Sequence, residues 1–87
     1  MTVNLLGIQH IDFTPPGETN NIHGCKLWFA REPLTNEADR WTHSVVGYRW
    51  VDFDDKLYQR AVALKPGITE LQFETDGKHT FLVDIEQ

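Results

Sequence analysis

The fold is decided by two segments, Val3-Asn-Leu-Leu-Gly-Ile-Gln-His-Ile-Asp-Phe-Thr14 and Ile22-His-Gly-Cys-Lys-Leu-Trp-Phe-Ala-Arg31. Both are rich in β-branched and aromatic residues, and the turn formers Pro15-Pro16-Gly17 lie between them. They therefore predict the two strands of a hairpin. Each arm has roughly 10 residues against the usual five or six, and a hairpin of this length must curl to bury one face. A long, bent first hairpin is typical of small five-stranded barrels.

Two glycines, Gly7 and Gly24, mark places where these strands can bulge or bend. The apolar residues of the first segment fall at both odd- and even-numbered positions. Their alternation changes at Gly7, as a β-bulge there would produce. The second segment alternates between two faces, with Cys25, Leu27 and Phe29 on one and Lys26, Trp28 and Ala30 on the other.

A third strand is predicted at Trp41–Val51, after the polar connection Glu32–Arg40. Both of its faces carry large groups, so periodicity does not tell which one is buried. One face holds Val46, Tyr48 and Trp50, and the other holds Trp41, His43, Val45 and Arg49. Among the three tryptophans, we expect Trp50 to belong to the core.

From Asp54 the apolar period becomes helical, with Leu57, Ala61 and Leu64 at positions i, i+4 and i+7. Asp54 or Asp55 can cap the start of this short helix, and Lys65-Pro66-Gly67 supplies a basic last turn and a stop.

Two more alternating strands, Ile68–Thr75 and His79–Ile85, flank Asp76-Gly77, a strong hairpin signal. The predicted class is mainly β, with one short helix between the third and fourth strands. This order is that of a five-stranded OB-fold-like barrel; an SH3-like barrel, which usually has only a helical turn there, is the alternative. Residues 1–87 are expected to form a single OB-like domain.

The composition limits the functions that the chain can have. The 87 residues carry 8 Lys and Arg against 13 Asp and Glu, a net charge of −5, which repels polyanions at long range. A nucleic-acid binder then needs a local basic stripe. Cys25 is the single cysteine, so no internal disulfide can form. That cysteine usage, a beginning without a signal-peptide pattern, and apolar runs too short to cross a membrane predict a cytoplasmic protein.

Catalytic and metal sites find little support in the sequence. His10 with Asp12, and His23 with Cys25, share strand faces, but no tight Cys or His cluster of the zinc-binding kind is present. Ser44 follows His43 directly, so on a strand the two would point to opposite faces and form no nucleophile–base pair. We therefore expect a protein that is not an enzyme and has no catalytic residues, cofactor or metal.

Aromatic and basic residues form the most informative set. Single-strand binders combine aromatic platforms for bases with basic groups that follow the phosphates. OB-folds use their second and third strands, with the adjoining loops, to bind oligonucleotides. The candidate nucleic-acid-binding residues on or beside those strands are Lys26, Trp28, Arg31, Arg40, Trp41 and Arg49. By parity we expect Lys26, Trp28, Trp41, His43 and Arg49 to share a face.

Two stretches, Gly7-Ile-Gln-His-Ile-Asp-Phe-Thr14 and Ile22-His-Gly-Cys-Lys-Leu27, resemble the opening of small proteins encoded by Gram-positive phages, plasmids and conjugative elements. Those proteins begin with a Gly-x-x-His-(Val/Ile)-(Asp/Ser)-(Tyr/Phe)-Thr strand. Leu57-Tyr58-Gln59-Arg60, before Leu64-Lys65-Pro66-Gly67, is similar to their helix and the turn after it. That family resembles the single-stranded DNA-binding proteins of filamentous phages, which are dimeric OB-type folds that coat replication intermediates.

The resemblance implies an OB-fold, single-stranded DNA as a partner, and a homodimer. It also implies contacts from Lys26 and from the aromatic residues of the second and third strands. The last hairpin departs from the family: many relatives have Tyr-Asn-(Arg/Lys)-(Phe/Tyr)-Gly where this chain has Phe73-Glu-Thr-Asp-Gly-Lys78, which lacks one aromatic residue and gains acidic ones.

Two functions stay open. In the first, the protein binds single-stranded nucleic acid without catalysis, which requires a continuous basic groove with exposed tryptophan faces. In the second, an acidic OB-like module binds another protein or self-associates, which requires an apolar or acidic patch and dispersed basic residues.

Overall fold

Strands and helix follow one another in the predicted order. A computed structural model describes all residues from Met1 to Gln87. Its elements are β1 (Thr2–Phe13), β2 (Ile22–Arg31), β3 (Val45–Asp52), α1 (Tyr58–Val62), β4 (Gly67–Thr75) and β5 (Thr80–Glu86). The prediction of a mainly β protein with one short helix between the third and fourth strands is confirmed.

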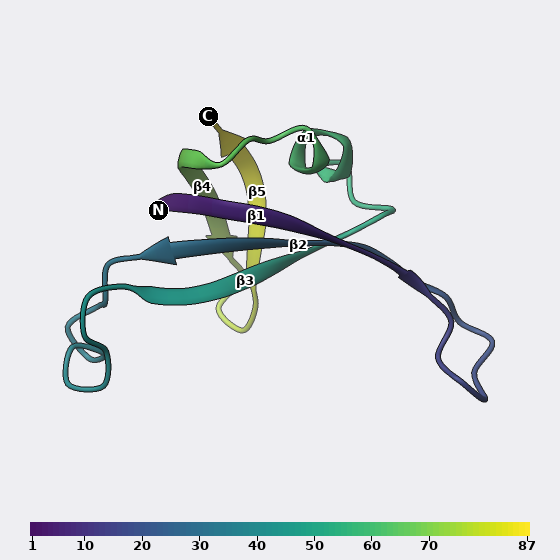
Figure 1. Ribbon diagram of the computed structural model, residues 1–87, viewed down its shortest axis with the longest axis horizontal. Helices are drawn as coiled ribbons and strands as arrows, with labels where there is room; N and C mark the ends of the chain where they lie inside the picture. The colour runs from purple at the N-terminus through teal and green to yellow at the C-terminus, as the bar shows by residue number, and fades with distance from the viewer.

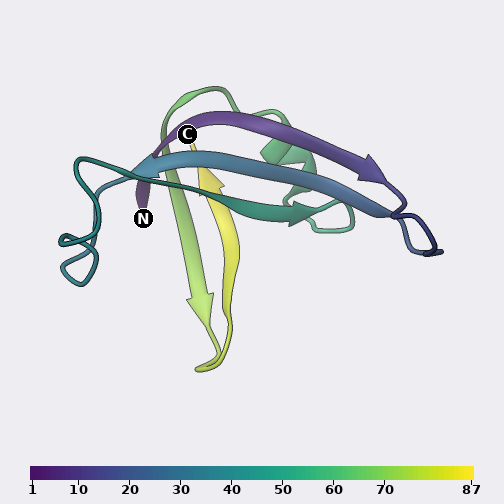
Figure 2. The ribbon, with the colours of Figure 1, turned by 60° about the horizontal axis from the view of Figure 1, so that its bottom comes forward.

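All five strands belong to one antiparallel sheet with the order β3-β2-β1-β4-β5. Strands β1 to β3 form a long curved layer, and the β4–β5 hairpin runs across its direction (Figures 1 and 2). Only the first part of β1, from Thr2 to Leu5, pairs with β4. No ladder joins β3 to β5, so the sheet is open and a closed barrel is not formed.

A β-bulge lies in β1 where the phase change predicts it. The register of the β1–β2 ladder shifts between Leu5 and Gly7, so Leu6 is the extra residue. Leu5 is 2% exposed and Leu6 is 47% exposed, which shows that the bulge carries the next apolar residue out of the core. No register shift occurs at Gly24, the other glycine at which we expected a bulge or bend.

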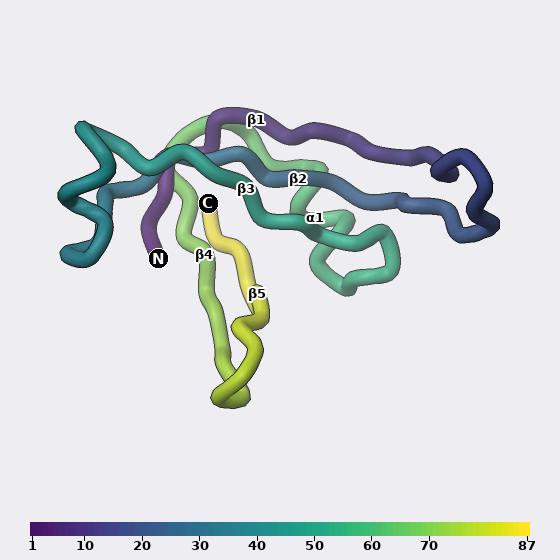
Figure 3. Tube along the Cα trace, turned by 90° about the horizontal axis from the view of Figure 1, so that it is seen from below, coloured from purple at the N-terminus to yellow at the C-terminus, as the bar shows by residue number.

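The core lies between the inner face of the curved layer, the helix and the β4–β5 hairpin. Both α1 and that hairpin lie on the same side of the layer (Figure 3). The buried cluster draws on every element and consists of Val3, Leu5, Cys25, Leu27, Phe29, Val51, Leu57, Ala61, Leu71 and Ile85.

The third strand is shorter than predicted because the chain turns before entering it. Trp41 donates its backbone N–H to the carbonyl of Glu37 at 3.2 Å, and His43 has a φ of 72°, in the left-handed region. A strand cannot continue through a residue in that conformation. Strand β3 therefore begins at Val45, and the prediction that Trp41 and His43 belong to it is wrong.

The helix also forms over fewer residues than its apolar period suggests. It covers Tyr58–Val62 with Leu57 at the N-cap position, where no side chain caps it. Asp55 instead accepts a hydrogen bond from the backbone N–H of Leu57 at 2.8 Å and shapes the turn that leads into the helix. The predicted aspartate cap is therefore wrong, although Asp55 orders the same region.

Candidate nucleic-acid interface

Cross-strand pairing determines which side chains share the outer face of β2 and β3. Lys26 lies opposite Trp50, and Trp28 lies opposite Tyr48. Residues that pair across an antiparallel ladder point to the same side of the sheet. Their neighbour Leu27 is fully buried. The outer aromatic cluster, which we define as Lys26, Trp28, Tyr48 and Trp50, therefore points away from the core.

Two aromatic rings and one ammonium group form the centre of this cluster. The ring centroids of Trp28 and Tyr48 are 4.9 Å apart at an interplanar angle of 53°. The Nζ of Lys26 lies 4.3 Å from the Tyr48 centroid and 6.0 Å from that of Trp28, within cation–π range. Gln9 on β1 accepts a hydrogen bond from the Trp28 indole N–H at 2.9 Å, which fixes the orientation of that ring. Tyr48 is 49% exposed, so this residue is in part accessible to solvent.

Trp50 belongs to the outer face because β2 has a glycine beside it. A Cβ atom at Gly24 would lie 2.5 Å from Cζ2 of the Trp50 ring and 2.5 Å from the carbonyl oxygen of Val51. The ring thus lies directly over Gly24 and covers its backbone. Trp50 is not part of the buried cluster, so the expectation that it is a core residue is wrong.

Arg49 points to the face opposite Lys26. It pairs with the buried Leu27, and its Nη2 donates to the carbonyl oxygen of Thr80 at 2.7 Å. Its guanidinium lies 5.5 Å from the Phe73 ring, so it links β3 to the β4–β5 hairpin. The expectation that Arg49 shares a face with Lys26 and Trp28 is wrong. In the β2–β3 register Lys26 pairs with Trp50, so its face of β3 carries the even-numbered residues and Arg49 points to the other face.

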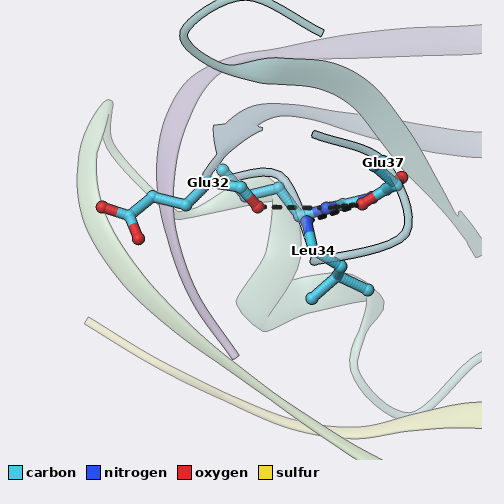
Figure 4. Close-up of polar contacts among 4 residues, drawn as sticks. Glu32, Leu34 and Glu37 are labelled. Atoms are coloured by element: carbon cyan, nitrogen blue, oxygen red, sulfur yellow. Dashed lines mark hydrogen bonds and ion pairs between the residues drawn. The ribbon is translucent and has the colours of Figure 1, made fainter. Parts of the chain in front are cut away.

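Arg31 is held by an ion pair in the β2–β3 connection. Its two terminal nitrogens donate to the two carboxylate oxygens of Glu37 at 2.8 and 3.0 Å. Glu37 also accepts the backbone N–H of Leu34 at 3.0 Å (Figure 4). These bonds, foremost the one from Arg31, lower the pKa of Glu37 to about 2, and the carboxylate raises the pKa of Arg31. The charge of Arg31 is thus already matched within the protein.

This ion pair predicts an acid-sensitive loop. The pKa of Glu37 is lower in the folded protein than its ordinary value of 4.5. The stabilisation is therefore complete above the unfolded value and is lost as the pH falls from there to about 2. A carbon-detected NMR titration of the side-chain carboxylates should find Glu37 still ionised at pH values well below 4.5. Glu37→Gln should remove this step in the acid dependence of loop stability, whereas a Glu37 that titrates near 4.5 would contradict the pairing.

Arg40 and Trp41, the remaining candidates, lie in the β2–β3 connection. Trp41 is 40% exposed, and neither residue makes an aromatic or cation–π contact with the outer aromatic cluster. Of the six predicted residues, the structure brings together only Lys26 and Trp28.

The sequence did not single out Tyr48 or Gln9 as members of the site, although the resemblance implies contacts from the aromatic residues of the third strand as a group. Their involvement depends on the strand registers, which place Tyr48 opposite Trp28 and Gln9 opposite Lys26. The sequence shows that both residues are aromatic, but it does not show that they pair across β2 and β3, because that depends on the register of the two strands.

Cys25 is the single cysteine of the chain, and it is buried. Burial raises the pKa of the Cys25 thiol, so this thiol is a weak nucleophile. The structure holds no group of three or more His, Cys, Asp and Glu side chains that could bind a metal ion. None of its helices has the length and apolar character needed to cross a bilayer.

We compared the chain with models of protein families, with curated proteins and with solved structures, and found no match in any of the three.

Proposed function

We propose that this protein binds single-stranded nucleic acid, without catalysis, on the outer face of β2 and β3. The observation that carries the proposal is the Trp28–Tyr48 ring pair, at 4.9 Å, with the Lys26 ammonium 4.3 Å from the Tyr48 ring. Bases stack on aromatic faces with about 1–3 kcal/mol each, whatever their identity, and a cation beside the rings pairs with a phosphate. The resemblance to small proteins of phages and mobile elements points to the same ligand.

We infer an OB-fold, which would support this use of the sheet. The strand order β3-β2-β1-β4-β5, with α1 between β3 and β4, is compatible with an OB-fold that stays open between β3 and β5. OB-folds are partly open five-stranded barrels, and they bind oligonucleotides on the faces of their second and third strands. The outer aromatic cluster lies on those two strands.

Stacking rather than charge should supply most of the affinity. Lys26 is the only basic residue of the outer aromatic cluster. Arg31 adds no free charge beside it because Arg31 is paired with Glu37, and Arg49 points to the other face of the sheet. Each phosphate neutralised on a single strand contributes a slope of about −0.7 to log K against log salt. With one lysine per chain, the salt dependence should therefore be shallow.

A fluorescence titration with a single-stranded oligonucleotide tests the proposal. Base stacking should quench Trp28, and Trp28→Ala or Tyr48→Ala should weaken binding by about 5- to 150-fold, the equivalent of one stacked base. Lys26→Gln should flatten the salt dependence that remains. Trp41→Ala is the matched control, because it removes an exposed tryptophan outside the outer aromatic cluster and should leave binding unchanged.

Two results would refute this function. One is a complete absence of quenching at low salt; the other is equal loss of binding in Trp41→Ala and Trp28→Ala when both remain folded.

A protein-interaction module is the second candidate, favoured by the distribution of charged and apolar groups. The chain has a net charge of −5, and the outer face continues past the outer aromatic cluster to Val46 and Ile68, which are 50% and 71% exposed. Quenching by an acidic or apolar peptide, with none by the oligonucleotide, would favour this candidate.

A further inference from the structure

The structure has one cavity of ligand size, and it lies outside the outer aromatic cluster. Its volume is about 550 Å³, within the range of roughly 300–1,000 Å³ that is usual for binding sites. It lies where the first residues of β1 meet the end of β2 and the beginning of β4, since Asn4 pairs with both Ala30 and Ile68. We call it the β1–β4 groove. None of the four residues of the outer aromatic cluster lines it.

Three aliphatic side chains from separate parts of the chain gather at this groove. Met1 precedes β1, Leu34 belongs to the β2–β3 connection, and Ile68 belongs to β4. They are 44%, 60% and 71% exposed, and Ile68 and Leu34 are the two most exposed large apolar residues of the chain. Exposed apolar residues that stand alone are ordinary, whereas a group of them around one cavity is typical of an interaction site.

Polar side chains of the groove are free to bond a ligand. Asn4 and Ser44 line it, and neither side chain forms a hydrogen bond within the protein. The amide of Asn4 offers two donors and an acceptor, and the hydroxyl of Ser44 offers one donor and an acceptor. These are the groups that the N–H and C=O of a peptide main chain can bond.

The only unpaired charge of the groove is negative. Arg31 is bonded to Glu37 at 2.8 Å, and the Met1 ammonium is bonded to Glu70 at 2.7 Å, so both cations are already matched. Glu32 lines the groove and forms no ion pair. Figure 4 shows its carboxylate directed away from Glu37. The groove therefore favours a cationic ligand and disfavours a phosphate.

From these observations we infer that the β1–β4 groove binds an extended segment of a partner protein, in which an aliphatic residue stands beside a lysine or arginine. The aliphatic side chain packs among the three exposed aliphatic residues, and the basic side chain pairs with Glu32. The main chain bonds to Asn4 and Ser44. A peptide segment combines these three chemistries, whereas a nucleic acid would bring phosphates to an unpaired carboxylate. The inference does not rest on nucleic-acid binding by the outer aromatic cluster.

A library of random heptapeptides displayed on phage tests this composition without assuming a partner. Peptides enriched on the immobilised parent chain should contain leucine, isoleucine or methionine next to lysine or arginine. Selection on Ile68→Ser should not enrich them, and this variant should fold because Ile68 is 71% exposed. Leu6→Ser is the matched control, because it removes an exposed aliphatic side chain outside the groove and should enrich the same peptides.

The affinity of a synthetic enriched peptide, measured by isothermal titration calorimetry, tests the charge. Glu32→Lys places like charges together and should raise the dissociation constant at least about 10-fold. Glu18→Lys makes the same change at an exposed residue outside the groove and should leave the affinity unchanged, as should Trp28→Ala.

Four results would overturn the inference. They are no enrichment on the parent chain, enriched peptides that are acidic, undiminished binding to folded Ile68→Ser or Glu32→Lys, and a loss of peptide binding in folded Trp28→Ala. The last result would place the peptide on the outer aromatic cluster instead.

Discussion

Leu27→Ala should lower the free energy of unfolding by about 2–5 kcal/mol, the range for deleting a large buried aliphatic side chain. Leu27 is 0% exposed and lies in the middle of β2, within the buried cluster that all elements share. The sheet is open and only 13 of 87 residues are buried, so little other core remains to compensate for the cavity. A domain of this length has a total stability of roughly 4–13 kcal/mol, so the variant should be close to unfolding at room temperature.

Leu6→Ala is the matched control for that prediction. It removes the same atoms from the bulge residue of β1, which is 47% exposed, and should change stability by less than about 0.5 kcal/mol. Urea denaturation followed by circular dichroism measures both variants. Equal losses in the two would show that the inner face of β2 is not the centre of the core.

Gly24→Ala should destabilise the protein by about 1–3 kcal/mol, the usual result of overpacking. The added Cβ would lie 2.5 Å from the Trp50 ring and 2.5 Å from the carbonyl oxygen of Val51. The ring can rotate away, but the backbone oxygen belongs to the β2–β3 ladder and cannot move without breaking hydrogen bonds. We therefore expect both a lower melting temperature and a change in Trp50 fluorescence.

Gly47→Ala provides the contrast on the neighbouring strand. A Cβ there meets nothing within 4 Å, and the φ of Gly47 is not positive. This substitution should be neutral or stabilise by about 0.4–1 kcal/mol through the unfolded chain. If Gly24→Ala were as harmless as Gly47→Ala, the close approach of Trp50 to the β2 backbone would be refuted.

The order of the strands, both hairpins and the bulge at Leu6 follow from patterns that neighbouring residues create. Alternation, turn formers and a phase change at Gly7 all depend on local sequence, and the structure agrees with them. The predicted start of β3 is wrong by four residues. The left-handed backbone of His43 and the turn at Glu37 do not change the pattern of apolar residues, so the sequence does not reveal them.

The candidate site could be predicted only in part: Lys26 and Trp28 were named from the sequence, whereas Tyr48 was included only among the aromatic residues of the third strand. Parity placed Arg49 beside Lys26, whereas the ladder pairs Lys26 with Trp50 and turns Arg49 inward. A shift of one residue in register exchanges the two faces of a strand, and the irregular β2–β3 connection gives no means of counting across it.

By itself, then, the sequence determined the type and the order along the chain of the strands and the helix, and which residues alternate along the strands, but not where β3 begins. Only the tertiary structure decided which of the two faces of β3 meets the aromatic residues of β2. It also decided that Arg31 forms an ion pair with Glu37 and that β3 and β5 are the edge strands of an open sheet. The physical reason is that local conformation depends on interactions within a few residues, whereas register and ion pairing between elements depend on contacts that form only when the sheet assembles.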